Sequence, residues 1–308
     1  MRKYISIFLS FLLALSLLSC SPTKSGESEG YTFLDDLGRE VTVSQGDKIA
    51  ACHASFADCM LLSGGELVGV TSDAVEDHGL SVGNAEIIGT AKTVNREALV
   101  ASGATVALLS ADLAAHLELE KPLESLGIGC VYFKVDTFDD YARVMGHLTA
   151  ITGREDLYDT HVTQVGERID EILEKIPKNE SRTLLLMRAY SSGIKAKNDD
   201  NLAGLILKEF GLGNIADSHP SLLEDMSLEH IVETDPDVIF VLTMGSEKSA
   251  LAYLKENIES NEAFASLCAV RSGNYHVLPK ELFHYKPNER WDESYEYLAK
   301  LLYGEKFN

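Results

Sequence analysis

Short apolar runs alternate with amphipathic stretches along the chain from residue 31 onward. The runs KIAAC at 48–52 and TLLLMRAY at 183–190 have the length and apolar content of buried strands. The stretch SFADCMLLSGG at 55–65 has helical spacing instead, and its two glycines favour the end of a helix. Strands that alternate with helices are typical of proteins in which helices cover a mostly parallel sheet. The pattern therefore predicts the α/β fold class.

The pattern repeats itself once along the chain. When the second half is laid over the first so that Ser227 falls on Asn95, NRE at 95–97 aligns with SLE at 227–229. In the same register, VALL at 106–109 aligns with VIFV at 238–241. In both copies a good N-cap residue stands two positions before a glutamate, which is typical of a helix start. Equivalent helix–strand units in the two halves predict two Rossmann-like α/β lobes of similar plan.

One long amphipathic stretch separates the two halves. Its apolar residues follow a single helical stripe with spacings of 3, 4, 3 and 4, namely Val162, Val165, Ile169, Ile172 and Ile176. About 20 residues of helix reach about 30 Å, enough to cross from one lobe to the other. We therefore predict an N-terminal lobe at 31–155, a single connecting helix at 156–178 and a C-terminal lobe at 179–308. The alternative is an ordinary core helix of one lobe.

The N-terminal segment predicts export and attachment to a membrane. Two basic residues precede an apolar run that ends at Leu18, which is short for a membrane span and typical of a secretory signal at 1–19. The sequence LLSC at 17–20 is similar to a bacterial lipobox, in which the thiol of Cys20 carries the lipid. Within the segment 20–30, the small polar residues that follow Cys20 are typical of a flexible tether, which would hold a domain beside a membrane without spanning it. The alternative is an ordinary secreted protein.

The charge of the chain limits its partners. The formal net charge is −21, and loss of Arg2 and Lys3 with the signal lowers it by two to −23. Binding to nucleic acid phosphates requires a basic surface, so we expect no nucleic acid partner. An acidic surface suits a protein partner with basic pockets.

The sequence offers no catalytic signature. It contains no G-x-S-x-G, P-loop, paired-histidine metalloprotease motif or dinucleotide fingerprint. The spacing of the cysteines that follow Cys20 matches no zinc or disulfide framework that we can defend, and buried thiols are the simplest interpretation of Cys52, Cys59, Cys130 and Cys268. We therefore expect a binding protein and not an enzyme.

Two α/β lobes, one connecting helix and a lipobox together resemble the helical-backbone substrate-binding lipoproteins of ABC importers, which carry ferric siderophores, haem or cobalamin. The likeness extends over residues 31–303 and depends on the order of its motifs. These are YTFLDDLGREVTV at 31–43, LVGVTSDA at 67–74, GTAKTVNREALVASGATVALLS at 89–110, MSLEHIVETDPDVIFV at 226–241 and NEAFASLCAVRSGNYHVLP at 261–279.

The resemblance implies a monomer that captures an iron complex in a cleft between its lobes and delivers it to a transmembrane permease with its ATPase. A ferric siderophore is the first expectation, and haem, cobalamin, a free metal ion or an oxyanion are the alternatives. No covalently bound cofactor is expected. A surface sensor or scaffold of the same fold, without a transport role, is a further alternative.

The same resemblance gives a role to the two glutamates of the repeat. In the family, acidic residues at the start of these paired helices dock into arginine pockets of the permease, and they match Glu97 and Glu229 here. The alternative is that each carboxylate merely stabilises its own helix start, by about 0.3–1 kcal/mol.

The candidate ligand residues follow the predicted strands. Ligands of α/β sheets bind beyond the carboxyl ends of the strands, and the family places its C-lobe ligand loop at 281–291. Cations and rings gather at these places in an otherwise acidic chain, and both suit a large anionic, partly aromatic ligand. The predicted ligand-binding residues are His53, Arg188, Tyr190, Lys197, His284, Tyr285, Lys286 and Arg290.

Other interpretations of these residues stay open at this point. Cys52, His53 and Cys59 offer soft ligands, but their spacing is no recognised zinc pattern. Haem would need an axial histidine or tyrosine, for which His53, Tyr190, His284 and Tyr285 are candidates. Trp291 follows the apolar face of a terminal helix, and we expect it to pack in the core.

Overall fold

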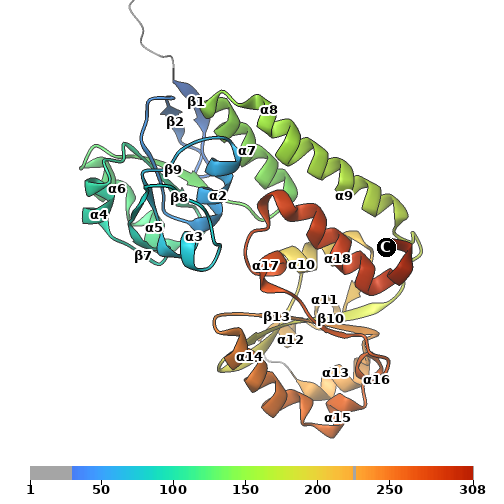
Figure 1. Ribbon diagram of the computed structural model, residues 1–308. Coiled ribbons are helices and arrows are strands. Elements are labelled where there is room, and N and C mark those ends of the chain that lie inside the picture. The colour runs from blue at the N-terminus through green and yellow to red at the C-terminus, as the bar shows by residue number, and fades with distance from the viewer. Residues whose placement is uncertain (1–29, 225–226, 308) are drawn as a thin grey trace, which may run out of the picture.

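The computed structural model describes residues 30–307 except 225 and 226, and it consists of two α/β lobes joined along one side by a helical connection (Figure 1). The signal at 1–19 and the lipidation residue Cys20 lie outside the described residues. The predicted fold class is confirmed by this arrangement.

The N-terminal lobe is built on a parallel sheet with the strand order β5-β4-β3-β8-β9. Its strands are β3 (Ile49–Ala51), β4 (Gly69–Val70), β5 (Glu86–Ile87), β8 (Val106–Ser110) and β9 (Gly129–Phe133). Two antiparallel pairs accompany the sheet, β1 (Tyr31–Leu34) with β2 (Glu40–Val43) and β6 (Gly89–Thr90) with β7 (Thr93–Val94).

The helices of this lobe differ in length, and the longest shows how the sequence defines its ends. This helix, α7 (Phe138–Thr152), begins with a capping box, in which the side chains of Thr137 and Asp140 each accept a hydrogen bond from the backbone N–H of the other residue. It ends at Gly153, which adopts the left-handed conformation. The others are α2 (Ala54–Leu62), α3 (Ser72–Glu76), α4 (Arg96–Ala101), α5 (Ala114–Leu117) and α6 (Glu120–Glu124).

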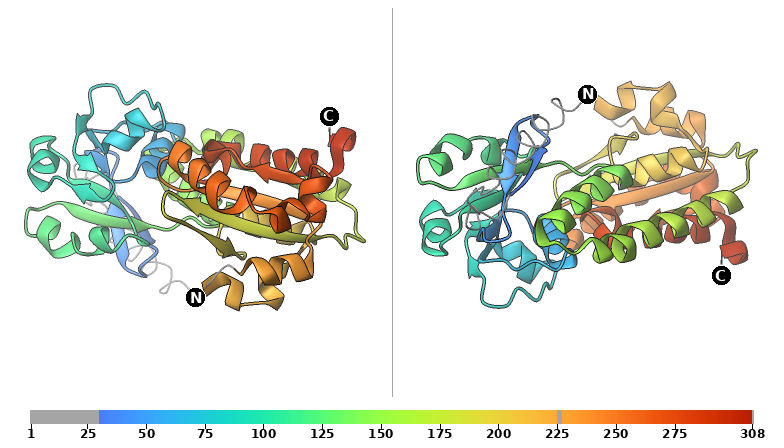
Figure 2. Two further views of the ribbon diagram at one scale, coloured as in Figure 1. Left: turned by 90° about the horizontal axis from the view of Figure 1, so that it is seen from below. Right: turned by 90° about the horizontal axis from the view of Figure 1, so that it is seen from above.

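The connection between the lobes is helical throughout. It runs as α8 (Glu155–Tyr158), a π-helical turn (Asp159–Thr163) and α9 (Gln164–Lys175). It therefore ends before residue 178, the bound expected from the sequence. Ile176 is already extended, with ψ 134°, because a residue that precedes a proline is disfavoured in the helical conformation. The apolar stripe is buried, and α9 packs beside the C-terminal helix α18 (Trp291–Tyr303), as the right view of Figure 2 shows.

The C-terminal lobe has a mixed sheet with the order β11-β10-β13-β14, and β12 also pairs with β10. Strand β11 runs antiparallel to β10, whereas the other pairs of this sheet are parallel. The strands are β10 (Thr183–Tyr190), β11 (Gly193–Lys197), β12 (Gly213–Asn214), β13 (Val238–Thr243) and β14 (Tyr275–Val277).

Short helices cover this second sheet. The first half of the lobe contains α10 (Leu202–Glu209), α11 (Ile215–Ser218), α12 (Ser221–Glu224) and α13 (Leu228–Thr234). The second half contains α14 (Glu247–Leu254), a π-helical turn (Lys255–Glu259), α15 (Glu262–Ala265), α16 (Cys268–Arg271), α17 (Lys280–Phe283) and the 3-10 turns Asn288–Arg290 and Gly304–Phe307, which flank α18.

The internal repeat is present in the structure in the expected register. Helices α4 and α13 begin at Arg96 and Leu228, and strands β8 and β13 begin at Val106 and Val238, so the helix and the strand have the same offset between the two copies. One hydrophobic cluster extends from the N-terminal lobe through the connecting helix into the C-terminal lobe. The two lobes therefore share packed side chains at their joint.

Candidate functional site

The N-terminal lobe presents His53 just beyond the carboxyl end of β3. His53 caps α2, because its Nδ1 accepts the backbone N–H of Ser55 at 3.2 Å. Burial lowers the pKa of His53 to about 4, so the ring is neutral at neutral pH. A neutral imidazole that accepts at Nδ1 carries its proton on Nε2. The ring therefore retains one N–H donor.

An aromatic contact joins the two lobes near this point. The ring of Tyr285, which follows α17, lies 4.6 Å from the ring of His78, which follows α3, measured between centroids. The ring of His284 is 5.2 Å from that of Tyr285, and the ammonium of Lys280 is 5.4 Å from the same tyrosine ring. The structure therefore brings the predicted residues His284 and Tyr285 together with His78, which no pattern in the sequence had marked as a site residue.

These histidines contribute rings and hydrogen-bonding groups more than charge. Burial, together with the positive charges of Lys280 and Arg188, lowers the pKa of His284 to about 4. Burial also lowers the pKa of His78. Aromatic and neutral polar groups at the lobe interface suit the flat or chelating part of a metal complex, whereas the cations suit its anionic groups.

The predicted residues of the C-terminal sheet occupy β10 and β11. Arg188 is half-buried and pairs in register with Lys195, and Tyr190 ends its strand opposite Gly193. Lys197 forms an ion pair with Asp200 on the loop that follows β11. The charge of Lys197 is therefore already balanced within its own lobe.

The predicted loop at 281–291 makes direct contact with the N-terminal lobe. The ammonium of Lys286 donates to the backbone carbonyl of Val135 and lies 3.3 Å from Asp136 Oδ1. Asn288 is 1% exposed and donates from Nδ2 to the Ser55 carbonyl at 3.0 Å and to Asp58 Oδ2 at 2.7 Å. Its Oδ1 accepts the Ser55 hydroxyl at 3.2 Å.

The same part of the chain also contacts the helical connection. Glu289 lies 2.6 Å from His161 Nδ1, and Asp292 lies 2.5 Å from Arg168 Nε. Asn288 adopts a positive φ of 50°, a conformation that asparagine tolerates better than most residues. The loop is thus shaped to reach both α2 and the connection from the second lobe.

Two residues at the end of the loop have their partners in or beside the terminal helix. Arg290 pairs with Glu293 at 2.7 Å, one turn further along. Trp291 is 2% exposed and packs edge-on against Phe138, with ring centroids 6.1 Å apart. The expected core position of Trp291 is confirmed. Arg290 forms its ion pair with Glu293 of α18 and not with a residue beside His284 or Tyr285.

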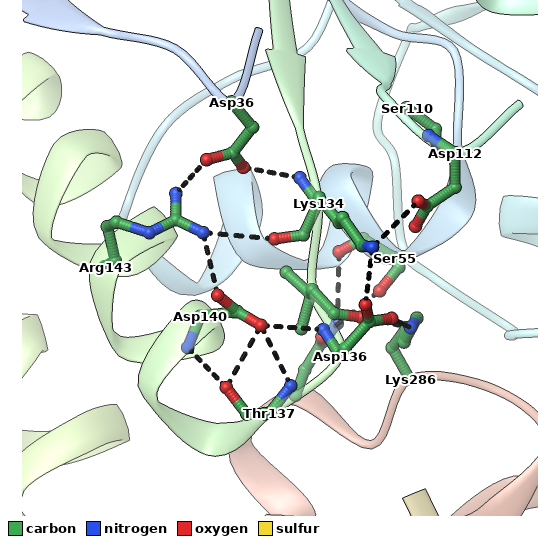
Figure 3. A network of polar contacts seen from close by, with 12 residues as sticks. Asp36, Ser55, Ser110, Asp112, Lys134, Asp136, Thr137, Asp140, Arg143 and Lys286 are labelled. Atoms are coloured by element: carbon green, nitrogen blue, oxygen red, sulfur yellow. Dashed lines mark hydrogen bonds and ion pairs between the residues drawn. The ribbon is translucent and has the colours of Figure 1, made fainter. Parts of the chain in front are cut away.

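A polar network holds the neighbouring edge of the N-terminal lobe (Figure 3). Arg143 of α7 binds Asp36 at 2.6 Å and Asp140 at 3.1 Å. Just beyond the end of β9, the Lys134 ammonium lies 2.9 Å from Asp136 Oδ2 and 3.4 Å from Asp112 Oδ1. Asp136 thereby lies between a lysine of each lobe.

The two glutamates of the repeat lie on separate helices of the surface. Glu97 and Glu229 both occupy the first turn of their helices, α4 and α13, and both are exposed. Among residues 30–224 and 227–307, neither carboxylate forms an ion pair. Figure 1 shows α4 and α13 on sides of their lobes that face away from α9.

The thiols contribute no metal site to the described part of the chain. The four cysteines that the structure describes, Cys52, Cys59, Cys130 and Cys268, are all free, and of these Cys268 alone is exposed. Burial raises the pKa of Cys52 to about 12, which keeps its thiol protonated and a poor metal ligand. No group of three His, Cys, Asp or Glu side chains in the described residues could hold a metal ion.

The residues that the structure describes also include no helix of the length and apolar character needed to cross a membrane.

Comparison with known proteins agrees with this architecture. The profile of the periplasmic binding protein family matches residues 67–282. The chain belongs to the periplasmic binding protein family. The family predicted from the sequence is thus confirmed, and the protein is a substrate-binding protein and not an enzyme.

Relatives extend over most of the chain. YhfQ of Bacillus subtilis, named as an ABC transporter substrate-binding lipoprotein, is 24% identical over 90% of this chain and 91% of its own length. The Fe(3+)-citrate-binding protein YfmC of the same organism is 23% identical over 88% of each chain. The solved structure of the siderophore-binding protein BauB, with acinetobactin and ferric iron, has a TM-score of 0.71 at 15% identity and covers 90% of this chain and 100% of that one.

Proposed function

We propose that this protein captures an anionic iron complex between its two lobes and delivers it to an ABC permease. The observation that carries the proposal is that neutral rings and cations from both lobes converge. The rings are those of His53, His78, His284 and Tyr285, and the cations are Lys286 and Arg188, of which Arg188 lies near His284. The rings suit the chelating groups of a ligand, and the cations suit its negative charge.

A ferric siderophore is the ligand class that we propose first. The relative YfmC is named for ferric citrate and BauB for a siderophore with ferric iron, which supports an iron chelate. Haem and cobalamin are the second candidates, since Tyr285, His53 and His284 offer groups that could contact the flat face of a macrocycle. The ligand would be cargo and not a resident cofactor.

A panel titration tests the ligand class. Mature protein without its lipid is titrated by calorimetry with ferric citrate, a ferric hydroxamate, a ferric catecholate, haem and cobalamin, and each complex is also tested for a shift of the melting temperature. We expect at least one iron chelate to bind with one-to-one stoichiometry. Binding of cobalamin alone, or of none of the five, would contradict the proposal.

Delivery would use the lipid anchor at Cys20 and the paired glutamates. We propose that a monomer, held at the outer face of the cytoplasmic membrane, places Glu97 and Glu229 in basic pockets of the permease. The support is that both carboxylates are exposed, that they occupy equivalent positions of the repeat, and that they form no ion pair among the described residues.

A paired substitution tests the docking role. Glu97→Ala with Glu229→Ala should abolish uptake of the iron complex by cells while leaving its affinity for the purified protein unchanged, because exposed charges steer association with the partner. The matched control is Glu118→Ala with Glu233→Ala, which removes the same charge from one exposed glutamate on each lobe. Normal uptake in the first double variant would exclude docking through these residues.

A further inference from the structure

Two lysines, one from each lobe, converge on a single carboxylate at the lobe interface. Lys134 follows β9 in the N-terminal lobe and lies 2.9 Å from Asp136 Oδ2. Lys286 belongs to the loop of the C-terminal lobe and lies 3.3 Å from Asp136 Oδ1. Each oxygen of one carboxylate thus has its own ammonium partner. Figure 3 shows the three side chains gathered at this place.

We propose that Lys134 and Lys286 form a binding site for a carboxylate group of the ligand, and that Asp136 occupies this site until the ligand displaces it. The proposal rests on the function proposed above, and it adds Lys134 as a ligand-binding residue and Asp136 as an internal competitor. The ligand class that fits is a ferric complex with free carboxylates, such as ferric citrate.

Hydrogen bonds that do not involve the Asp136 side chain hold the backbone around the site in place. The backbone N–H of Lys134 donates to Asp36 Oδ2 at 2.6 Å, and its carbonyl accepts from Arg143 at 3.2 Å. The backbone N–H of Asp136 donates to Asp140 Oδ2 at 3.0 Å. Because these bonds fix the main chain, the Asp136 side chain can leave the lysines without loosening the loop.

The charged groups are accessible to an incoming ligand. The side chains of Lys134, Asp136 and Lys286 are 48%, 46% and 35% exposed. Ion pairs at this level of exposure are weak, because water screens them and solvates the separated charges. A polycarboxylate ligand that also contacts the rings of His78 and Tyr285 can therefore replace Asp136, whereas an uncharged chelate gains nothing from doing so.

Asp136→Asn tests the proposal because it removes the one negative charge that contacts both lysines and keeps the shape of the side chain, while Asp112 stays beside Lys134 in every variant. We expect this variant to bind ferric citrate about two- to five-fold more tightly than the wild type, in line with the small strength of exposed pairs. Its affinity for a ferric hydroxamate without free carboxylates should stay unchanged. The double variant Asp136→Asn with Lys134→Gln should lose the gain.

Asp139→Asn is the matched control. Asp139 is exposed, lies three residues further along the chain in the first turn of α7 and forms no ion pair within the described residues, so its substitution lowers the net negative charge equally. Calorimetry on the wild type and the three variants gives the affinities, and melting temperatures show that each variant folds.

The outcomes separate this proposal from the function proposed above. An unchanged or weaker affinity of Asp136→Asn for ferric citrate would overturn the competitor role, even where the wild type binds iron complexes. An equal gain of affinity in Asp139→Asn, or an equal gain of Asp136→Asn for the hydroxamate, would show that the effect comes from the overall charge of the protein. Either result would also overturn the competitor role. If neither the wild type nor Asp136→Asn binds any iron complex, both proposals fail together.

Discussion

The loop of the C-terminal lobe makes two different kinds of contact with the N-terminal lobe. Asn288 is buried and uncharged, and its amide forms hydrogen bonds to Ser55 and Asp58 of α2. Lys286 is partly exposed and charged, and it meets a carboxylate and a carbonyl. Buried amide bonds are costly to leave unmade, whereas exposed ion pairs contribute little. The first contact therefore holds the lobes together, and the second is free to exchange partners.

Removal of the Asn288 amide should have the largest effect. We expect Asn288→Ala to lower the free energy of unfolding by about 2–4 kcal/mol, since it takes the Asn288 partner from the buried Ser55 hydroxyl and from the half-buried Asp58 carboxylate, and places an alanine at a positive φ that asparagine tolerates better. Urea denaturation measures this change.

Asn288→Gly is the matched control for this prediction, because it loses the same hydrogen bonds without the backbone strain. It should lose somewhat less stability than Asn288→Ala. A loss below about 0.5 kcal/mol in both variants, the lower limit for a single hydrogen bond, would show that the amide does not hold the joint.

Acid should lower the stability of the protein through two partly buried histidines near the lobe interface, His53 and His284. The pKa of His53 and that of His284 are both lowered to about 4, from about 6.5 in an unfolded chain. Between these two values the unfolded chain binds more protons than the folded one, so stability falls as the pH drops from about 6.5 to about 4. His53→Asn, which retains a capping side chain, should make this fall shallower. An equally steep fall in urea titrations of this variant would contradict the assignment.

Tyr285 should matter for the ligand more than for the fold. Its ring is half-buried and contacts His78 across the lobes. We expect Tyr285→Ala to weaken binding of the iron complex by about ten-fold, since stacking on an aromatic ring contributes on the order of 1 kcal/mol or more. The melting temperature should change little. Arg290→Ala is the comparison, because Arg290 already forms an ion pair with Glu293. If Arg290 has the predicted ligand role, this variant must also lose affinity for the iron complex.

Lys286 should contribute least to stability. We expect Lys286→Gln to lower the free energy of unfolding by no more than about 1 kcal/mol, and this difference should shrink in high salt because the pair with Asp136 is screened. The effect of Asn288→Ala should not depend on salt. Urea denaturation at low and high salt compares the two. Equal salt dependence in both variants would remove the distinction between the two contacts.

The sequence was sufficient for the fold because the fold depends on short-range patterns. Apolar runs predicted β10 and β13, the alternating spacing of apolar residues predicted α9, and the internal repeat predicted the equivalence of α4 with α13. Within the connecting segment predicted at 156–178, the last helical residue is Lys175, because the conformation of Ile176 is restricted by the proline that follows it.

The candidate site was only partly predictable, because its contacts join distant segments. Tyr285 and His284 could be found as ring-bearing residues of a loop, but their neighbour His78 belongs to the other lobe and lies far away along the chain. Asn288 was part of the expected loop, and nothing in the sequence pairs it with Ser55. Likewise, the convergence of a lysine from each lobe on one carboxylate depends on the placement of the two lobes.

The most direct test of the central claim is the position of the iron. Crystals of the mature protein grown with ferric citrate, measured at the iron absorption edge, give an anomalous peak for each bound ion. We predict one strong peak between the lobes, beside Tyr285 and His78, with a carboxylate of the ligand near Lys134 and Lys286. An iron peak on an outer surface of either lobe, with the lobe interface occupied only by protein contacts, would contradict the claim.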